Sequence, residues 1–252
     1  MGSSFVRRRR DEIVRLLEQN GSMGVAELSE LFKISPLTVR RDLDALASQG
    51  MVRRSYGTVE LAERPEHDSS YERERAKRAI AARAAQLIDD GDIVFINTGT
   101  TALGALEFVL AENVTFVTNN GRALSSSLPP SSTMILTGGE IRVPKWSMTG
   151  DFALANIGQI KAGKCFLSCS GLSAQRGLTT NIAQEMRINE LMLENSAFHV
   201  VLADSSKIGV DASFSYGSAD QIDVLVTDSL MSDEHARLLE QAGVRAILRV
   251  DV

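Results

Sequence analysis

The chain has 252 residues, 44% hydrophobic and 23% charged, which is the balance of a soluble globular protein with one or two domains. No run approaches the roughly 20 apolar residues of a membrane span. The basic stretch at 7–10 leads into Asp11-Glu12 instead of an apolar segment, which argues against a secretory signal and favours the cytoplasm. The net charge of −5 is unevenly divided, because residues 1–60 carry 10 Lys and Arg against 8 Asp and Glu; a locally basic module on an acidic body favours a DNA reader joined to another domain.

Two amphipathic helices are predicted first, over residues 6–18 and 25–32. Asn20-Gly21 separates them, because both residues tolerate the positive φ of a helix end. The expected inward-facing residues are Ile13, Leu16 and Leu17 in the first helix, and Ala26, Leu28 and Leu31 in the second.

A third helix is predicted from Ser35-Pro36, a hydroxyl N-cap followed by proline at the first helical position, to Gly50. Its buried seam consists of Val39, Leu43 and Leu46, at i, i+4 and i+7. Thr38, Arg40 and Arg41 then point away from the seam near the N-terminal half of the helix. A helix-turn-helix reads bases with this part of its second helix, so we interpret it as a recognition helix; a solvated arginine face is the alternative.

A hairpin is predicted next, with strands over 51–56 and 58–61 around Gly57. Arg53 and Arg54 on this wing would lie beside the DNA backbone, where phosphate contacts set register without reading sequence. The candidate DNA-binding residues are Ser35, Thr38, Arg40, Arg41, Arg53 and Arg54, in a domain over residues 1–61.

These residues carry a family resemblance. The run Thr38-Val39-Arg40-Arg41-Asp42-Leu43, with Ser35 before it and Gly50 after it, resembles the DNA-binding signature of DeoR-type transcriptional regulators. One departure is visible, because the family often closes its wing with His-Gly-Gly-Ala, where this chain has Tyr-Gly-Thr-Val at 56–59.

Residues 62–71 are polar and predict a linker, in which His67 is interpreted as solvated. Residues 72–252 predict an α/β domain with a mainly parallel open sheet, since seven short apolar runs alternate with helical patterns. The runs cover 93–96, 114–118, 134–137, 165–169, 200–203, 224–227 and 245–250, and the helical patterns 71–90, 102–111, 183–194 and 233–242. Cys165 and Cys169, in the fourth run, are interpreted as buried, inert thiols and not as metal ligands.

Polar loops follow several of these runs, at the strand ends where open α/β sheets bind ligands. Glycines, hydroxyls and a lysine in such loops favour an anionic ligand, although a capped strand-to-helix junction is the alternative for any single loop. The candidate effector-binding residues are Asn97, Thr98, Gly99, Thr100, Thr101, Asn119, Asn120, Gly138, Gly139 and Lys207.

The same loops extend the resemblance to the DeoR-family effector domain, which is similar in fold to ribose-5-phosphate isomerase and CoA-transferase subunits. The resemblance implies a phosphorylated sugar or related metabolite, with residues 98–101 on the phosphate and Lys207 nearby. A second departure is Asn97, where the family commonly has aspartate; an amide donates as well as accepts hydrogen bonds and is uncharged.

The leading hypothesis is a regulator, most simply a repressor of a carbohydrate operon, that binds operator DNA as a homodimer or homotetramer under effector control, without cofactor or metal. The rival hypothesis is a sugar-phosphate isomerase-like enzyme with an accessory DNA-binding module, for which Glu140, Glu185 and Asp204 are the available acid/base candidates. A small-molecule carrier without regulation would leave the N-terminal module without a role.

Overall fold

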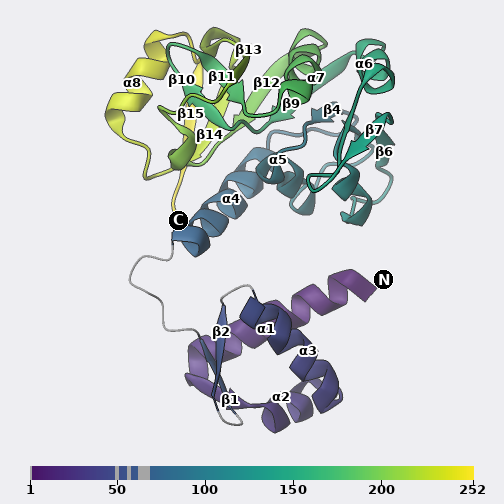
Figure 1. The fold of residues 1–252 in the computed structure, drawn as a ribbon, viewed down its shortest axis with the longest axis vertical. Coiled ribbons are helices and arrows are strands. Elements are labelled where there is room, and N and C mark those ends of the chain that lie inside the picture. The colour runs from purple at the N-terminus through teal and green to yellow at the C-terminus, as the bar shows by residue number, and fades with distance from the viewer. Residues whose placement is uncertain (1, 49–50, 56–57, 62–68) are drawn as a thin grey trace. The chain divides into compact units, whose positions relative to one another are not determined.

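The computed structural model describes residues 2–48, 51–55, 58–61 and 69–252. The chain divides into two compact units, Met1–Ser69 and Ser70–Val252, and both are drawn in Figure 1. Gly57 of the predicted wing turn and residues 62–68 of the predicted linker lie outside the described residues. Among the described helices, none is long and apolar enough to cross a membrane.

The first unit is a helix-turn-helix with a small sheet beside it. Its elements are α1 (Gly2–Asn20), β1 (Ser22–Gly24), α2 (Val25–Phe32), α3 (Pro36–Ser48), β2 (Val52–Ser55) and β3 (Thr58–Leu61). The strands are antiparallel in the order β1-β3-β2, so β1 adds a third strand to the predicted hairpin. The fully buried residues that hold the unit together are Ile13, Leu17, Leu28, Val39, Leu43, Leu46, Val52 and Val59.

The predicted inward face of α2 is wrong in two of its three residues. Leu28 is buried, but Ala26 and Leu31 are exposed, Leu31 by 56%. Val25, Leu28 and Phe32 pack toward the core instead. Their 3- and 4-residue spacing is the spacing of one helix face, which the apolar Leu31 obscured in the sequence.

The second unit is built on a seven-stranded, wholly parallel sheet of order β15-β14-β12-β9-β4-β5-β6. Its strands are β4 (Ile93–Ile96), β5 (Thr115–Thr118), β6 (Thr133–Leu136), β9 (Ala162–Leu167), β12 (Ser196–Leu202), β14 (Val224–Asp228) and β15 (Ala246–Val250). All seven predicted strands are therefore present, with bounds that differ by up to four residues. The predicted fold class, a winged helix-turn-helix followed by an open parallel α/β sheet, is confirmed.

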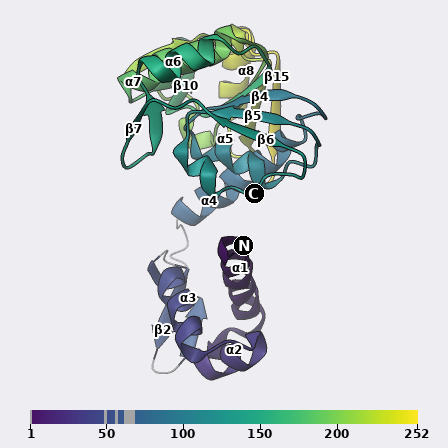
Figure 2. The same cartoon turned by 90° about the vertical axis from the view of Figure 1, so that its right-hand side faces the viewer.

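Helices cover both faces of this sheet. Figure 2 shows α6 (Asp151–Gly158) and α7 (Ala183–Glu194) on one side and α4 (Ser69–Ala85) and α5 (Thr100–Gly104) on the other. Successive residues of a strand point to opposite faces, so Phe95 packs with the α6 and α7 side while Val94 and Ile96 pack with α4 and α5. Burial on both faces explains why the strands read as continuous apolar runs.

The helices agree less evenly with the prediction. The helix expected over 102–111 is the short α5 followed by the 3-10 turn η1 (Ala105–Glu107). Gly104 lies at this change, and glycine weakens a helix because its backbone loses more conformational freedom on folding. α7 has its predicted bounds, and α8 (Asp233–Gln241) ends one residue early.

Two further strand groups and three 3-10 turns were not predicted. A hairpin joins β7 (Glu140–Arg142) to β8 (Ser147–Thr149), and β10 (Gly171–Ser173), β11 (Gly177–Thr180) and β13 (Phe214–Gly217) form a small antiparallel sheet. The turns are η2 (Gly121–Ser125), η3 (Ser205–Lys207) and η4 (Ala219–Gln221).

Candidate functional site

The start of α3 is fixed by its predicted cap. The Ser35 hydroxyl accepts a hydrogen bond from the Thr38 backbone N–H (3.2 Å) and lies 2.9 Å from the Thr38 hydroxyl. Arg40 and Arg41 are exposed, and Val39 between Thr38 and Arg40 is fully buried. The geometry therefore presents both arginines on the solvent side of the helix that follows the helix-turn-helix turn.

Asp42, the next residue, fastens this helix to α1. Its carboxylate is almost fully buried and receives the Nε–H of Arg9 at 2.6 Å and of Arg10 at 2.9 Å. Two guanidinium groups compensate one buried charge, as a buried carboxylate requires. Sequence reasoning counted these arginines only as basic charge and missed that they position α3.

The wing carries an ion pair of its own. Arg53 on β2 lies opposite Glu60 on β3, and its guanidinium donates to the Glu60 carboxylate at 3.0 and 3.1 Å. Both side chains are largely exposed, so salt and competing anions weaken this pair. Arg54 lies opposite Val59 in the strand register, and its side chain lies outside what the structure describes.

The second unit has its switch point between β4 and β9. Strand order runs outward from β4 through β5 and β6 on one side, and from β9 through β12, β14 and β15 on the other. In open α/β sheets the ligand crevice lies outside the carboxyl ends of the strands at this point. Asn97 follows β4 and Ser168 follows β9, so these two residues stand at the switch point.

Asn97 ties the two central strands together. Its Oδ1 accepts from the backbone N–H of Gly99 and of Ser168, both at 3.1 Å, and its Nδ2 donates to the Ser168 carbonyl at 2.8 Å and to Asn189 Oδ1 at 3.2 Å. The side chain is buried and uses both its acceptor and its donor groups. This explains the amide, since an ionised carboxylate could not donate to Ser168 or Asn189.

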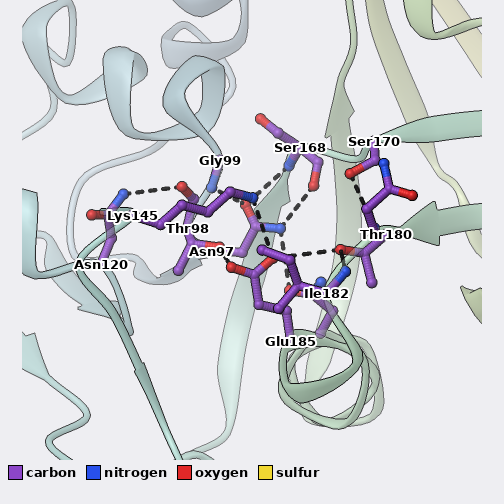
Figure 3. Close-up of polar contacts among 12 residues, drawn as sticks. Asn97, Thr98, Gly99, Asn120, Lys145, Ser168, Ser170, Thr180, Ile182 and Glu185 are labelled. Carbon is purple, nitrogen blue, oxygen red and sulfur yellow. Dashed lines mark hydrogen bonds and ion pairs between the residues drawn. The ribbon is translucent and has the colours of Figure 1, made fainter. Parts of the chain in front are cut away.

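A second polar chain runs through Thr98, as Figure 3 shows. The Thr98 hydroxyl donates to Glu185 Oε1 at 2.9 Å, and the Thr98 carbonyl accepts from Asn120 Nδ2 at 3.3 Å. Glu185, on α7, is also reached by the Thr180 hydroxyl at 3.5 Å and by Lys145 Nζ at 3.8 Å. A buried carboxylate, two hydroxyls and an ammonium group thus meet beside the predicted effector turn.

The turn itself is shaped by Ser168. The Ser168 hydroxyl accepts the Ala102 backbone N–H at 3.0 Å, which caps α5 from the neighbouring strand. Gly99 makes this approach possible, because a Cβ there would lie 2.2 Å from the Ser168 Cβ. Of the two threonines that follow, Thr100 is exposed and Thr101 is buried.

Asn119, after β5, leaves a buried acceptor open. Its Nδ2 donates to the Met148 carbonyl at 3.2 Å, which fixes the orientation of the amide. Its Oδ1 is buried and has no hydrogen-bond partner among the described residues. Buried polar atoms are nearly always paired, so this oxygen stands out among the polar atoms that the structure describes.

The remaining predicted residues lie around this centre. Gly138 and Gly139 follow β6 and have φ of 69° and 98°. A Cβ at Gly139 would lie 2.4 Å from the Thr149 carbonyl oxygen. The two glycines therefore allow the chain to turn after β6 and to pass close to the hairpin. Lys207 lies in η3, beyond the carboxyl end of β12, and its backbone N–H donates to Asp204 at 2.9 Å. It stands at the same sheet edge, but the polar chain through Thr98 reaches Lys145 instead.

The other residues singled out in the sequence are the two cysteines and the acid/base candidates Asp204 and Glu140. Cys165 is buried as predicted, but Cys169 is only half-buried. Desolvation raises the pKa of both thiols to about 12, so neither is a nucleophile near neutral pH. Asp204 accepts from the backbone N–H and the hydroxyl of Ser206, which caps η3. Glu140 is exposed on β7.

Sequence reasoning missed Ser168, Asn189 and Lys145. Ser168 was placed inside a strand expected over 165–169, but β9 ends at Leu167. Asn189 lies on α7, far along the chain from the strand end that it contacts. Lys145 lies in the sequence Val-Pro-Lys-Trp at 143–146, between two strands of three residues that are too short to show a period.

A winged helix-turn-helix followed by a separate, parallel α/β unit defines a two-part transcriptional regulator. The comparisons with known proteins are more specific: residues 9–64 match the DeoR-like helix-turn-helix domain, and residues 72–229 match the DeoR C-terminal sensor domain. The chain belongs to the DeoR family of transcriptional regulators, as the sequence resemblance predicted.

Curated relatives span nearly the whole chain. The HTH-type transcriptional regulator GlpR of Haloferax volcanii is 30% identical over 245 residues, which cover 95% of this chain and 96% of the relative. The glycerol-3-phosphate regulon repressor of Escherichia coli is 30% identical over 244 residues, which cover 91% and 97%. Among solved structures, the full-length sorbitol operon regulator SorC of Klebsiella pneumoniae is 11% identical over 96% of each chain, with a TM-score of 0.38.

Proposed function

We propose that this protein is a repressor of a carbohydrate-metabolism operon, and that a phosphorylated sugar or polyol bound at the carboxyl ends of β4, β5 and β9 lowers its affinity for operator DNA. The observation that carries the proposal is the buried polar cluster at the switch point of the sheet. It brings a buried carboxylate, two threonine hydroxyls and the half-exposed ammonium group of Lys145 together beside the loop after β4, and these groups suit an anionic, hydroxyl-bearing ligand.

The names of the relatives support the chemical class. One is a glycerol-3-phosphate regulon repressor, and another is a lactose phosphotransferase system repressor from Staphylococcus epidermidis, 29% identical over 233 residues. On this basis we assign the effector site to Asn97, Thr98, Gly99, Thr100, Thr101, Asn119, Asn120, Gly138, Gly139 and Lys207. The buried members position the turn, Thr100 and Gly139 are exposed, and Gly99, Gly138 and Lys207 are half-buried.

On the DNA side, we infer that Arg40 and Arg41 contact the major groove, with Ser35 and Thr38 at the start of the helix and Arg53 and Arg54 on the backbone. The exposure of the two α3 arginines supports this assignment. A homodimer or homotetramer, acting in the cytoplasm, would present paired recognition helices to half-sites about one helical turn apart or a multiple of it.

The test is operator binding by the full chain to DNA from upstream of its own gene, at fixed salt. A panel of sugar phosphates and polyol phosphates is titrated beside the unphosphorylated parent of each. The proposal expects one phosphorylated compound to weaken binding while its parent does not. If no compound changes the affinity, the effector part of the proposal is wrong.

The same panel addresses catalysis. We infer that the protein is not an enzyme, since the Asp204 and Glu185 carboxylates are engaged with Ser206 and Thr98 and Glu140 is exposed on β7. Slow isomerisation of a sugar phosphate, with no effect of any compound on operator binding, would favour the isomerase-like alternative.

A further inference from the structure

We propose that Lys145, carried on the β7–β8 hairpin, is the cation that binds the phosphate group of the effector, and that Glu185 holds it in place while the site is empty. This inference rests on the proposed function, because it names the residue and the exchange by which the same site takes its ligand. It also moves the anion-binding role from Lys207, which the sequence favoured, to a residue on another element.

The hairpin is anchored over the strand ends. Its register pairs Glu140 with Thr149 and Arg142 with Ser147, so residues 143–146 form the tip. The Met148 N–H donates to the Asn119 carbonyl at 2.7 Å, and the Gly121 N–H donates to the Trp146 carbonyl at 2.8 Å. These bonds join the second strand to the loop after β5, so the hairpin brings Lys145 to the switch point from the side of β5.

The contact between Lys145 and Glu185 is loose. The Nζ to Oε2 distance is 3.8 Å, longer than a hydrogen bond, and the lysine side chain is 51% exposed while the glutamate side chain is 5% exposed. Figure 3 shows the lysine side chain directed toward the buried carboxylate. An ammonium group has three donors, so Lys145 can take an incoming anion without leaving the neighbourhood of Glu185.

Charge explains why this cation is needed. Glu185 lies next to the predicted phosphate turn, where its Oε1 holds the Thr98 hydroxyl at 2.9 Å. A phosphate close to a buried carboxylate would be repelled unless a cation stood between them. Lys145 is the ammonium group that reaches this carboxylate, so it is placed to reduce the repulsion between the two anions when the ligand enters.

The proposal predicts that substitutions at Lys145 and at Glu185 have opposite effects on phosphate binding. Lys145→Gln removes the cation and leaves the carboxylate to repel the ligand, so phosphate binding weakens. Glu185→Gln keeps an oxygen that accepts from Thr98, frees Lys145 and removes the repulsion, so phosphate binding tightens. A purely structural role for the pair would weaken binding in both variants.

The test uses the full chain and inorganic phosphate as the probe, because every phosphorylated effector carries this group. Trp146 is the single tryptophan of the chain and adjoins Lys145, so its fluorescence reports the hairpin, and calorimetry gives an independent dissociation constant. Chloride at matched ionic strength controls for general screening. Arg142→Gln is the matched control, since it removes the same charge from the same hairpin.

We expect saturable phosphate binding by the wild type, a loss of about tenfold or more in Lys145→Gln, a tighter constant in Glu185→Gln and little change in Arg142→Gln. Equal binding by Lys145→Gln and the wild type, an equal loss in Arg142→Gln, or no binding of phosphate by the wild type would each overturn the assignment. If the operator is still released by a phosphorylated compound in those cases, the proposed function stands and only the role of Lys145 fails.

Discussion

Replacing Asn97 by aspartate tests the account of the switch point most directly. The substitution keeps the size of the side chain and its acceptor oxygen, but it removes the Nδ2 donor that reaches the Ser168 carbonyl at 2.8 Å and Asn189 at 3.2 Å. The Asn189 amide can rotate and donate to the new oxygen, so one bond is regained. What remains is the repulsion between a carboxylate oxygen of Asp at this position and the Ser168 carbonyl oxygen that it faces.

The cost of that contact is estimated from buried hydrogen bonds. Loss of one partner of a buried bond costs about 1–3 kcal/mol, more when a charge is buried, and the Ser168 carbonyl keeps a second donor, the Tyr216 hydroxyl at 3.3 Å. For a unit of this size the melting temperature would fall by about 2–12 °C. The loss should shrink as the pH falls, because a protonated carboxyl donates to the Ser168 carbonyl again.

The assay is thermal unfolding of the full chain followed through Trp146, which lies in the second unit and reports it alone. Asn156→Asp is the control, because the exposed Asn156 also donates its Nδ2 to a carbonyl, that of Thr137 at 2.8 Å, but water can replace the bond. We expect a change under about 0.5 kcal/mol there. Equal stability of wild type and Asn97→Asp, or equal losses in both variants, would refute the reasoning.

Three further outcomes follow from the described contacts. Arg40→Ala or Arg41→Ala should weaken operator binding by about 1–3 kcal/mol if the arginine pairs with a base, as measured by a gel-shift titration at fixed salt. If both variants bind with wild-type affinity, the assignment of α3 as the recognition helix is excluded. Asp42→Asn should lower the unfolding free energy of the first unit, followed by circular dichroism, by about 1–3 kcal/mol, since the amide keeps one acceptor oxygen and loses the charge that both arginines contact. A variant as stable as the wild type would argue against the α1–α3 clamp. Cys165, which is buried and has its pKa raised to about 12, should resist iodoacetamide at pH 8 in the native chain and react after denaturation. Native labelling of Cys165 would contradict its burial.

The sequence predicted the parallel sheet well for a physical reason. Strands such as β4 and β14 are buried on both faces, so their apolar runs are continuous and need no tertiary information to be seen. α7 was predicted with its bounds because its apolar positions keep a helical period between Ile182 and Asn195. The α2 face was misjudged, because in eight residues one exposed leucine outweighs the pattern.

The effector site could be predicted only in part. The loop after β4 is a local feature, and its polar and glycine residues mark it in the sequence. Glu185, Asn189 and Lys145 reach that loop from α7 and from a hairpin with three-residue strands, and nothing in their local sequence shows which strand end they approach. These contacts join segments that are far apart in the sequence, and the local pattern of one sequence does not show which distant segments meet.

The same long-range pairing sets the order in which the protein can assemble during synthesis. Asn97 meets Ser168 across 71 residues and Thr98 meets Glu185 across 87, whereas the helix-turn-helix closes its contacts within the first 61 residues. Contacts of large sequence separation form late, and domains fold as units from the N-terminus on the ribosome. We therefore expect the nascent chain to have a folded DNA reader well before α7 emerges, so that a truncated product would occupy DNA with no means of sensing the effector.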